Sequence, residues 1–365
     1  MRQGPTCLSI YPPLSPRILL RRPVRRLPFP LQEPDCRLYM EARQGLWWAL
    51  KGLGIGSGDE ILVPAYHHGS EVEVLMRAGA HPRFYDCRET FTPDEAELES
   101  LRGQRLRALY LIHQLGFAQD TRRWRRWCDE HGLLLIEDGA QAWLSAWDGR
   151  PVGADADAAL FCLYKVFGVA DGGAVFCKSF AGPPPDAESA GVRAMAGRLA
   201  DWAAQRSRLA AGLFRDRRYP PGHDERPEVD FALTALDERA TRITRSLLSR
   251  VVDTDAPARR RANFARLAER LGELRSAAFA VMPAGSSPLA FPIEVGDKRA
   301  VVDRLARRGI MESRMWTVPH PVMDAGAFPG AAALRARLVG LPVHQELGPE
   351  DVDRIADAVA SAVAG

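Results

Sequence analysis

A lysine between two apolar runs is the first residue of this 365-residue chain that could carry chemistry. Residues 159–163 (Ala-Leu-Phe-Cys-Leu) and 173–177 (Gly-Ala-Val-Phe-Cys) have the composition of buried strands, and Lys165 lies in the loop between them. Because desolvation disfavours an ammonium, the sequence predicts a lowered pKa for Lys165. A neutral amine can attack a carbonyl and form a Schiff base. The alternative is a lysine that extends from a strand end to solvent.

The second candidate is an acidic pair at the end of another apolar stretch. Residues 133–136 (Leu-Leu-Leu-Ile) are followed by Glu137, Asp138, Gly139, Ala140 and Gln141. A carboxylate at the carboxyl end of a strand in an α/β sheet lies where ligands bind. A pyridoxal cofactor requires an acid against its ring nitrogen, and Asp138 is placed to provide one. The alternative is a helix N-cap, the commoner role of an isolated Asp at this place.

Four strings of the chain together resemble the DegT/DnrJ/EryC1/StrS aminotransferases, mostly sugar aminotransferases of the fold type I pyridoxal-phosphate class. They are residues 53–65, 136–141, 165–173 and 341–344, and the resemblance runs from about Leu38 to the C-terminus. It implies an α/β fold with a large domain, whose mixed, mostly parallel sheet is covered by helices, and a smaller C-terminal α/β domain. It also implies that Lys165 binds pyridoxal 5'-phosphate, Asp138 faces the ring nitrogen and Gln141 lies near the phenolic oxygen.

The cofactor phosphate is expected at the start of a helix within residues 38–53. A helix N-terminus offers free N–H groups and a favourable dipole to a phosphate. The family has a Gly-Thr-x-Ala-Leu string here, whereas this chain has Ala42 followed by Arg43, Gln44 and Gly45, so the threonine hydroxyl is missing. Arg43 either supplies a charge-assisted contact to the phosphate or is a surface residue.

Two further phosphate ligands of the family are altered in this chain. A serine upstream of the lysine corresponds to Cys162, whose thiol is a weaker donor; the alternative is a small buried hydrophobic residue. The family's Asn-x-Arg string, which reaches the phosphate of the partner subunit, falls near residues 240–242 without its asparagine. Arg242 or Arg245 would have to serve alone.

An aromatic residue that stacks on the pyridine ring follows a strand-ending proline in the family. Counting from Pro64 places this position at His68, with Tyr66 or His67 as alternatives if the loop is displaced by one residue. An imidazole can stack on a heteroaromatic ring, and the other interpretation is a simple loop histidine.

Three residues are candidates for the substrate side of the site. His113 follows the apolar stretch 106–112 in a loop that matches the family's Val-His-x-x-Gly string, where it either contacts the site or only satisfies backbone groups. Trp316 and His320 lie in a segment similar to the family's substrate loop and either shape the pocket or pack in the core.

Composition predicts a globular, cytoplasmic protein. Apolar residues make up 46% of the chain and the net charge is only +3, which indicates neither nucleic-acid nor membrane partners. The six cysteines form no Cys-x-x-Cys pair, so neither a metal site nor a disulfide framework is predicted. The alternation of strands and helices favours a largely parallel sheet.

The chain is expected to divide into an N-terminal arm (1–37), a large cofactor-binding domain (38–245) and a small C-terminal domain (246–365). The arm is rich in Pro and Arg and is expected to lie extended on the body or on a partner subunit, although a nucleic-acid-binding arm is an alternative. A helix is expected over about residues 191–215. Homodimers with shared active sites are implied by the resemblance alone.

The predicted function is an aminotransferase that moves an amino group from glutamate or glutamine to a keto acceptor, namely a keto-sugar nucleotide or a related biosynthetic intermediate. A pyridoxal-phosphate enzyme of the same family with a replacement or cyclisation reaction is one alternative. A non-catalytic relative that acts as a binding partner is another, motivated by the altered phosphate ligands. Family members that are sugar dehydratases carry histidine in place of the lysine, so Lys165 argues against that reaction.

Overall fold

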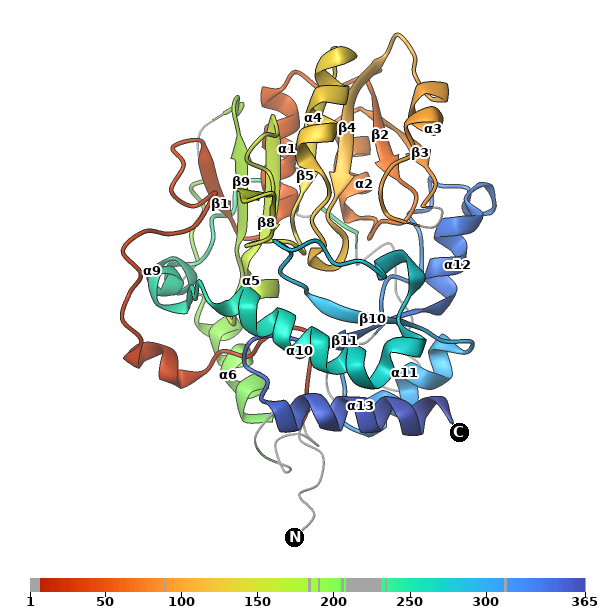
Figure 1. Ribbon diagram of the computed structural model, residues 1–365. Coiled ribbons are helices and arrows are strands. Elements are labelled where there is room, and N and C mark those ends of the chain that lie inside the picture. The colour runs from red at the N-terminus through yellow and green to blue at the C-terminus, as the bar shows by residue number, and fades with distance from the viewer. Residues whose placement is uncertain are drawn as a thin grey trace.

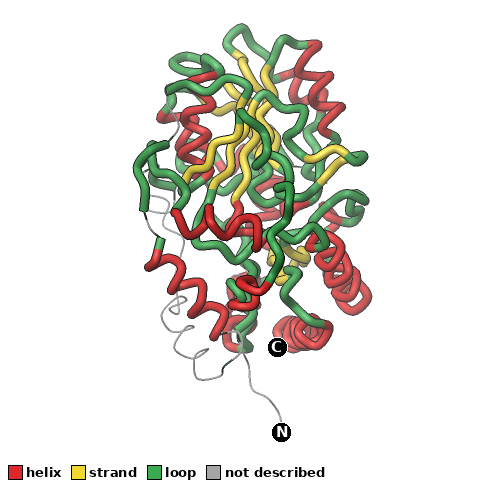
Figure 2. Tube along the Cα trace, turned by 90° about the vertical axis from the view of Figure 1, so that its left-hand side faces the viewer, coloured by secondary structure: helices red, strands yellow, loops and turns green. Residues whose placement is uncertain are grey.

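The computed structural model describes residues 7–87, 90–182, 185–189, 191–204, 207, 231–233, 235–311 and 314–364. A large sheet with helices on both faces forms the upper part of the view, and a smaller C-terminal part lies below it (Figure 1). Figure 2 shows the same two parts from the side.

Seven strands form the large sheet in the order β1-β9-β8-β5-β4-β2-β3. The five strands from β8 to β3 pair in parallel, whereas β9 is antiparallel to both of its neighbours. The bounds are β1 Cys36–Tyr39, β2 Glu60–Pro64, β3 His81–Tyr85, β4 Leu106–Ile112, β5 Leu134–Asp138, β8 Ala158–Cys162 and β9 Gly173–Cys177. β6 (Ala146–Trp147) and β7 (Arg150–Pro151) form a separate hairpin. Because parallel strands end at one edge, the loops after β2, β4, β5 and β8 meet there.

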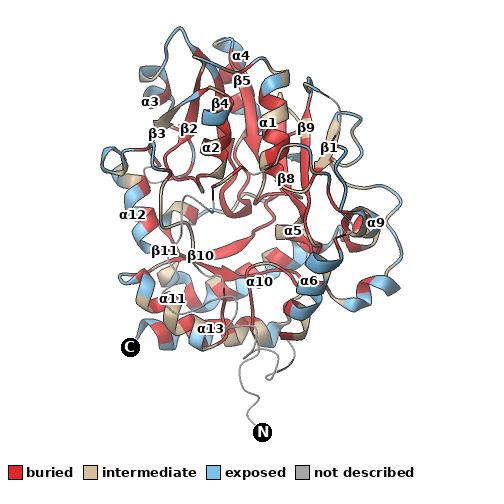
Figure 3. Ribbon diagram, turned by 180° about the vertical axis from the view of Figure 1, so that it is seen from behind, coloured by how far each residue is buried: buried red, intermediate tan, exposed pale blue. Residues whose placement is uncertain are grey.

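Alternate side chains of the strands enter two separate apolar clusters, one on each face of the sheet. Leu62 and Leu109 pack with α4, whereas Ile61 and Ala108 pack with α1 and α2. The helices around this sheet are α1 Ala42–Gly52, α2 Ser70–Arg77, α3 Glu95–Ser100, α4 Thr121–Glu130, α5 Leu163–Val166 and α9 Arg242–Val251, whereas α6 Val192–Ala204 lies below the sheet (Figure 1). Both faces are buried (Figure 3), which explains why these strands are continuously apolar in the sequence.

The Asp-Gly-Gly string after Lys165 has a packing role at the start of β9. A Cβ atom on Gly173 would lie 2.1 Å from the backbone nitrogen of Ala42, so α1 can begin against β9 only if this residue is glycine. The carboxylate of Asp171 accepts hydrogen bonds from the backbone N–H (3.0 Å) and hydroxyl (2.7 Å) of Thr241, which caps α9. The string therefore fixes the loop that carries Lys165 against two helices.

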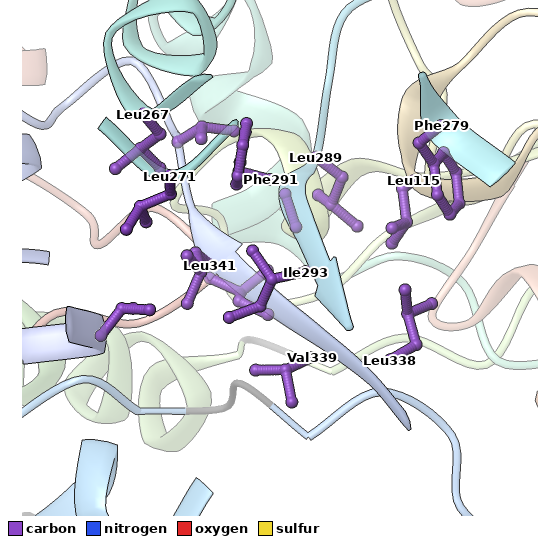
Figure 4. Packing of buried hydrophobic residues seen from close by; sticks show 14 of the residues in the cluster. Leu115, Leu267, Leu271, Phe279, Leu289, Phe291, Ile293, Leu338, Val339 and Leu341 are labelled. Atoms are coloured by element: carbon purple, nitrogen blue, oxygen red, sulfur yellow. The ribbon is translucent and has the colours of Figure 1, made fainter. Parts of the chain in front are cut away.

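The C-terminal part has its own apolar core around an antiparallel pair of strands. Its elements are α10 Ala256–Leu271, β10 Ala290–Glu294, α11 Lys298–Arg307, α12 Pro329–Arg337, β11 Leu338–Pro342 and α13 Pro349–Val363. Phe291 and Ile293 of β10 pack toward Leu267 and Leu271 of α10 (Figure 4). α9 joins the core of the large sheet, so the packing of the small part begins only with α10, some residues after the predicted division at 245.

The segment before β1 lies on the body of the same chain. Leu8 and Ile10 belong to the core of the C-terminal part, whereas Leu14 and Ile18 belong to a core of the large sheet. A 3₁₀ helix covers Pro16–Leu20. From residue 7 onward, the predicted arm thus packs on both parts of its own chain.

The helix expected over residues 191–215 is α6 (Val192–Ala204), and residues 208–215 lie outside the described part of the chain. Within the described residues, every helix falls short of the length and apolar character needed to cross a bilayer.

Candidate active site

A cavity of about 450 Å³ lies where the loops after the parallel strands meet. Lys165, Asp138, Gln141, Cys162 and His68 all line it. They come from the ends of β2, β5 and β8 and from α5, which begins directly after β8. The fold therefore brings these five predicted residues to one place, and Arg43 and Trp316 line the same cavity.

Asp138 is buried at the last position of β5, with 7% of its surface exposed. Its Oδ2 accepts a hydrogen bond from the hydroxyl of Tyr110 (2.7 Å), and its Oδ1 accepts one from the N–H of Ala140 (2.8 Å). Burial raises the pKa of Asp138, while these two donors and the nearby Lys165 act to lower it. Two hydrogen bonds therefore fix the orientation of a carboxylate that lines the cavity.

Lys165 lies in the short helix α5, between β8 and the loop that leads to β9. Burial by itself lowers the pKa of its ammonium, but the acidic side chains around it act in the opposite direction and raise the pKa above its ordinary value. These are Cys162, Tyr164, Tyr11 and Asp138. The predicted lowered pKa is therefore wrong for the chain alone, because the fold surrounds the lysine with groups that favour its charged form.

The loop after β2 places His68, and neither of its alternatives, at the cavity. His68 packs edge-on against Trp316, with 5.9 Å between the ring centroids, and its Nδ1 lies 3.2 Å from the hydroxyl of Ser70. Burial, followed by the charges of Lys165 and Arg43, lowers the pKa of His68 to about 3. An imidazole that stays neutral is suited to packing against a ring.

His67 points the other way, into the interior. Its Nδ1 lies 3.0 Å from the carbonyl oxygen of Pro64, its Nε2 accepts from the N–H of His320 (3.3 Å), and its ring stacks on Phe84. Burial, and then the charge of Arg335, lower its pKa to about 3. The unfolded chain, where an ordinary histidine titrates near pH 6.5, therefore binds more protons than the folded chain between about pH 3 and 6.5.

The expected consequence is that the free energy of unfolding falls as the pH drops from 6.5 toward 3. His67→Gln should reduce this slope by about 1.4 kcal/mol per pH unit, measured by urea denaturation at several pH values. His81→Gln, at the exposed start of β3, is the control and should keep the wild-type slope. An unchanged slope in His67→Gln would show that His67 takes up its proton equally in both states.

The start of α1 also borders the cavity, through Ala42 and Arg43. The guanidinium of Arg43 pairs with the carboxylate of Glu41 (3.0 Å) and donates to the carbonyl oxygen of Ala232 (3.1 Å). Gln44 and Gly45 do not line the cavity. The Gln44 amide oxygen accepts from the Glu41 N–H (2.9 Å), and Gly45 packs where a Cβ would lie 2.5 Å from Val175.

Two further predicted residues, Cys162 and Gln141, also line the cavity. Cys162 lines it at the end of β8, and burial raises the pKa of its thiol. The amide oxygen of Gln141 accepts a hydrogen bond from the backbone N–H of Leu115 (2.7 Å), which turns its side chain toward the loop after β4.

Of the remaining predicted residues, only one lines the cavity. Trp316 lines the cavity, whereas His113 and His320 do not. His113 is fully buried and its Nε2 lies 2.9 Å from Glu137, while His320 lies 3.2 Å from Glu73. The side chain of Arg242 is 73% exposed and pairs with Glu188 at the surface of this chain, so any contact of Arg242 with a cofactor would have to be made in another subunit.

Several residues at the cavity had no signal in the sequence. Glu71 caps the start of α2 by accepting from the N–H groups of His68 and Gly69, and burial raises its pKa. Tyr11 comes from the N-terminal segment, far from the motifs, whereas Arg314 lies two residues before Trp316 in the segment similar to the family's substrate loop but was not itself predicted.

A buried arginine holds the carbonyl group that follows Lys165. Arg260 of α10 is fully buried, and its guanidinium donates to the carbonyl oxygens of Val166 (2.9 Å) and Pro288 (3.2 Å) and to the amide oxygen of Gln345 (2.8 Å). Gln345 also donates to Val166 (2.9 Å). Burial lowers the pKa of Arg260 to about 9. The C-terminal part thus forms hydrogen bonds directly with the loop that carries Lys165.

Arg260→Leu is expected to destabilise the protein by about 2–4 kcal/mol, because buried carbonyl and amide oxygens lose their donors. Urea denaturation measures the change. The matched control is Arg259→Leu on the same helix, since Arg259 makes only an exposed ion pair with Asp253, and such pairs contribute about 1 kcal/mol or less. Equal effects of the two substitutions would contradict the role of Arg260.

Part of the chain is similar in sequence to a known protein family. Residues 40–181 match the model of the DegT/DnrJ/EryC1/StrS aminotransferase family. The chain is 33% identical to the GDP-perosamine synthase of Vibrio cholerae over 134 residues, which is 36% of each protein. That match therefore spans little more than a third of the relative's length. This chain is also 29% identical to the dTDP-3-amino-3,4,6-trideoxy-alpha-D-glucose transaminase of Micromonospora megalomicea subsp. nigra. That match covers 337 residues, which is 87% of this chain and 82% of the relative.

Solved structures share the fold. The crystal structure of DesV from S. venezuelae superposes with a TM-score of 0.64 over 90% of this chain and 84% of that chain, at 24% identity. The predicted architecture, a mixed and mostly parallel sheet covered by helices with a smaller C-terminal α/β part, is confirmed. The stretch of residues 40–181 that matches the model of the DegT/DnrJ/EryC1/StrS aminotransferase family contains six of the seven strands of the large sheet, together with Asp138 and Lys165.

Proposed function

We propose that this protein is a pyridoxal-phosphate-dependent aminotransferase that transfers an amino group from glutamate or glutamine to a nucleotide-linked keto sugar or a related biosynthetic ketone. The observation that carries the proposal is the presence of Lys165 and the buried carboxylate of Asp138 in one cavity. The names of the relatives, which are sugar transaminases and synthases of amino sugars, support the class of acceptor.

The residues present fit the cofactor at both of its ends. Each oxygen of the Asp138 carboxylate accepts one hydrogen bond within the chain and can accept another, as a protonated ring nitrogen requires. α1 and α2 both begin at the cavity, where the positive ends of the two helix dipoles favour a phosphate. Arg43 would add a charge, since a guanidinium has five donors and can pair with Glu41 and a phosphate together.

The roles of the chain's own residues follow from this arrangement. The bound cofactor would supply an electron sink conjugated to the substrate nitrogen. The carboxylate of Asp138 would hold a proton on the ring nitrogen, and Tyr110 would orient that carboxylate. The Nζ of Lys165 would bind the cofactor and, once released, take a proton from the substrate carbon and return it. The buried surroundings of Lys165 would exclude water from this transfer.

The test combines purified protein, pyridoxal phosphate and ¹⁵N-labelled glutamate or glutamine with a set of nucleotide-linked keto sugars. The proposal expects ¹⁵N in the amino-sugar product, detected by mass spectrometry. If ¹⁵N leaves the glutamate or glutamine but does not appear in the sugar product, a replacement or cyclisation reaction is favoured instead. A protein that binds no pyridoxal phosphate at all would favour the non-catalytic relative.

We also propose that the protein forms homodimers in which Arg242 reaches the site of the other subunit. The exposure of its side chain leaves it accessible for this contact. Analytical ultracentrifugation tests the assembly, and Arg242→Ala should weaken cofactor binding without changing the folding of the single chain.

A further inference from the structure

The N-terminal strap, residues 8–14, connects the two parts of the chain across the cavity. At its first end, the Leu8 N–H donates to the carbonyl oxygen of Gly309 (2.7 Å), and the Leu8 carbonyl oxygen accepts from the N–H of Met311 (2.7 Å). Leu8 and Ile10 are each 2% exposed in the core of the C-terminal part. This end is therefore fixed to the small domain.

The other end of the strap lies directly on the loop that follows Lys165. A Cβ atom on Gly168 would lie 2.4 Å from the carbonyl oxygen of Pro13 and 2.5 Å from the backbone nitrogen of Leu14. The absence of a side chain at Gly168 allows the two backbones to touch. Leu14 is 4% exposed and belongs to a core of the large sheet.

Between these two anchors, Ile10 and Tyr11 line the same cavity as Lys165. The hydroxyl of Ser9 donates to the carbonyl oxygen of Tyr11 (2.7 Å) and fixes the backbone there. The ring of Tyr11 packs edge-to-face on Tyr164, with centroids 6.3 Å apart and an angle of 79° between the planes. Tyr164 immediately precedes Lys165, so a ring from the strap touches the neighbour of the lysine.

We infer that the strap is a wall of the active site and that Tyr11 is a positioning residue, which holds Tyr164, and through it Lys165, against the bound cofactor and acceptor. The inference rests on the proposed function, because that function gives the cavity its ligands. Leu8, Ile10 and Leu14 are sufficient to anchor the strap. Tyr11 is only partly buried, and its ring is presented to the cavity where a ligand would cover it.

The test compares Tyr11→Ala and Tyr11→Phe with the wild type. Loss of the ring contact should speed the release of pyridoxal phosphate about threefold to tenfold, measured by absorbance after dilution, since an edge-to-face pair contributes this much. Tyr11→Ala should also raise the KM for the keto acceptor more than it lowers kcat. Tyr11→Phe keeps the ring and should restore the slow release of pyridoxal phosphate, which a general loss of stability would not explain.

Leu20→Ala is the matched control, because Leu20 follows the strap and is 86% exposed; it should behave as the wild type. As a readout independent of activity, hydrogen exchange at residues 8–14 should slow when pyridoxal phosphate is added to the wild-type protein. Suppose that the wild-type protein binds the cofactor. If Tyr11→Ala then releases it at the wild-type rate, or if hydrogen exchange in the strap does not change, this inference is wrong while the proposed function stands. A wild-type protein without cofactor binding would overturn the proposed function, and this inference with it.

Discussion

Replacement of Lys165 by alanine is expected to lower transamination by at least about 10⁴-fold, because the only amine in the cavity placed beside Asp138 among the described residues is removed. Without the Nζ atom, the proton at the substrate carbon has no basic group to take it. The purified wild-type protein mixed with pyridoxal phosphate should also show a visible absorption band that borohydride traps as a covalent adduct. Mass spectrometry should locate that adduct on Lys165 and find none in the variant.

Lys165→Arg is the matched control for charge. It keeps a cation near Asp138 but cannot form the covalent bond, so it should fold like the wild type and lack both the trapped adduct and the activity. Unfolding curves of the three proteins separate loss of chemistry from loss of structure. Transamination at wild-type rates by Lys165→Ala would remove Lys165 from the mechanism.

The second large effect is expected for Asp138→Asn, which should lower kcat by about 10²–10³-fold. A neutral amide still fits between Tyr110 and Ala140, but it cannot hold a proton on the ring nitrogen of the cofactor. Loss of one preorganised electrostatic contact typically has an effect of this size. Steady-state kinetics with saturating cofactor measure the effect, and the absorbance of the bound cofactor shows whether the variant still binds it.

Tyr110→Phe is the control that leaves the carboxylate in place. The hydroxyl of Tyr110 lowers the pKa of Asp138 by donating to it, so its removal raises that pKa further. Because Asp138 then ionises at a higher pH, the loss of activity in this variant should be smaller than in Asp138→Asn and should shrink as the pH rises. Equal losses in both variants at every pH would assign the effect to the hydroxyl and not to the charge.

Much of the fold and half of the candidate site could be predicted from local sequence. The continuous apolar runs that end at Asp138 and just before Lys165 indicated buried parallel strands, and such strands present their carboxyl ends at one edge. The resemblance to the family, counted from Pro64, indicated that the loop with His68 approaches the cavity. These signals are readable because a strand, its end and its first polar residue are contiguous in the chain.

His113 shows where such local signals end. It follows β4 at the same edge as the other strand ends, yet its ring is turned inward to Glu137 and does not reach the cavity. Only the packing of β4 between β2 and β5 decides the direction in which the first residue of its loop points. Gln44 and Gly45 likewise follow the expected position of the phosphate, but they serve the cap and the packing of α1.

The sequence by itself determined the class of the fold, the lysine and the carboxylate, because these depend on runs of apolar residues and on the residue that ends each run. Only the tertiary structure decided what surrounds them. Tyr11 and Arg260 reach the lysine loop from distant segments, and the raised pKa of Lys165 results from acidic groups that burial assembles around it. Contacts between residues far apart in the chain leave no period or spacing in the sequence, and the electrostatics of a buried site depend on those contacts.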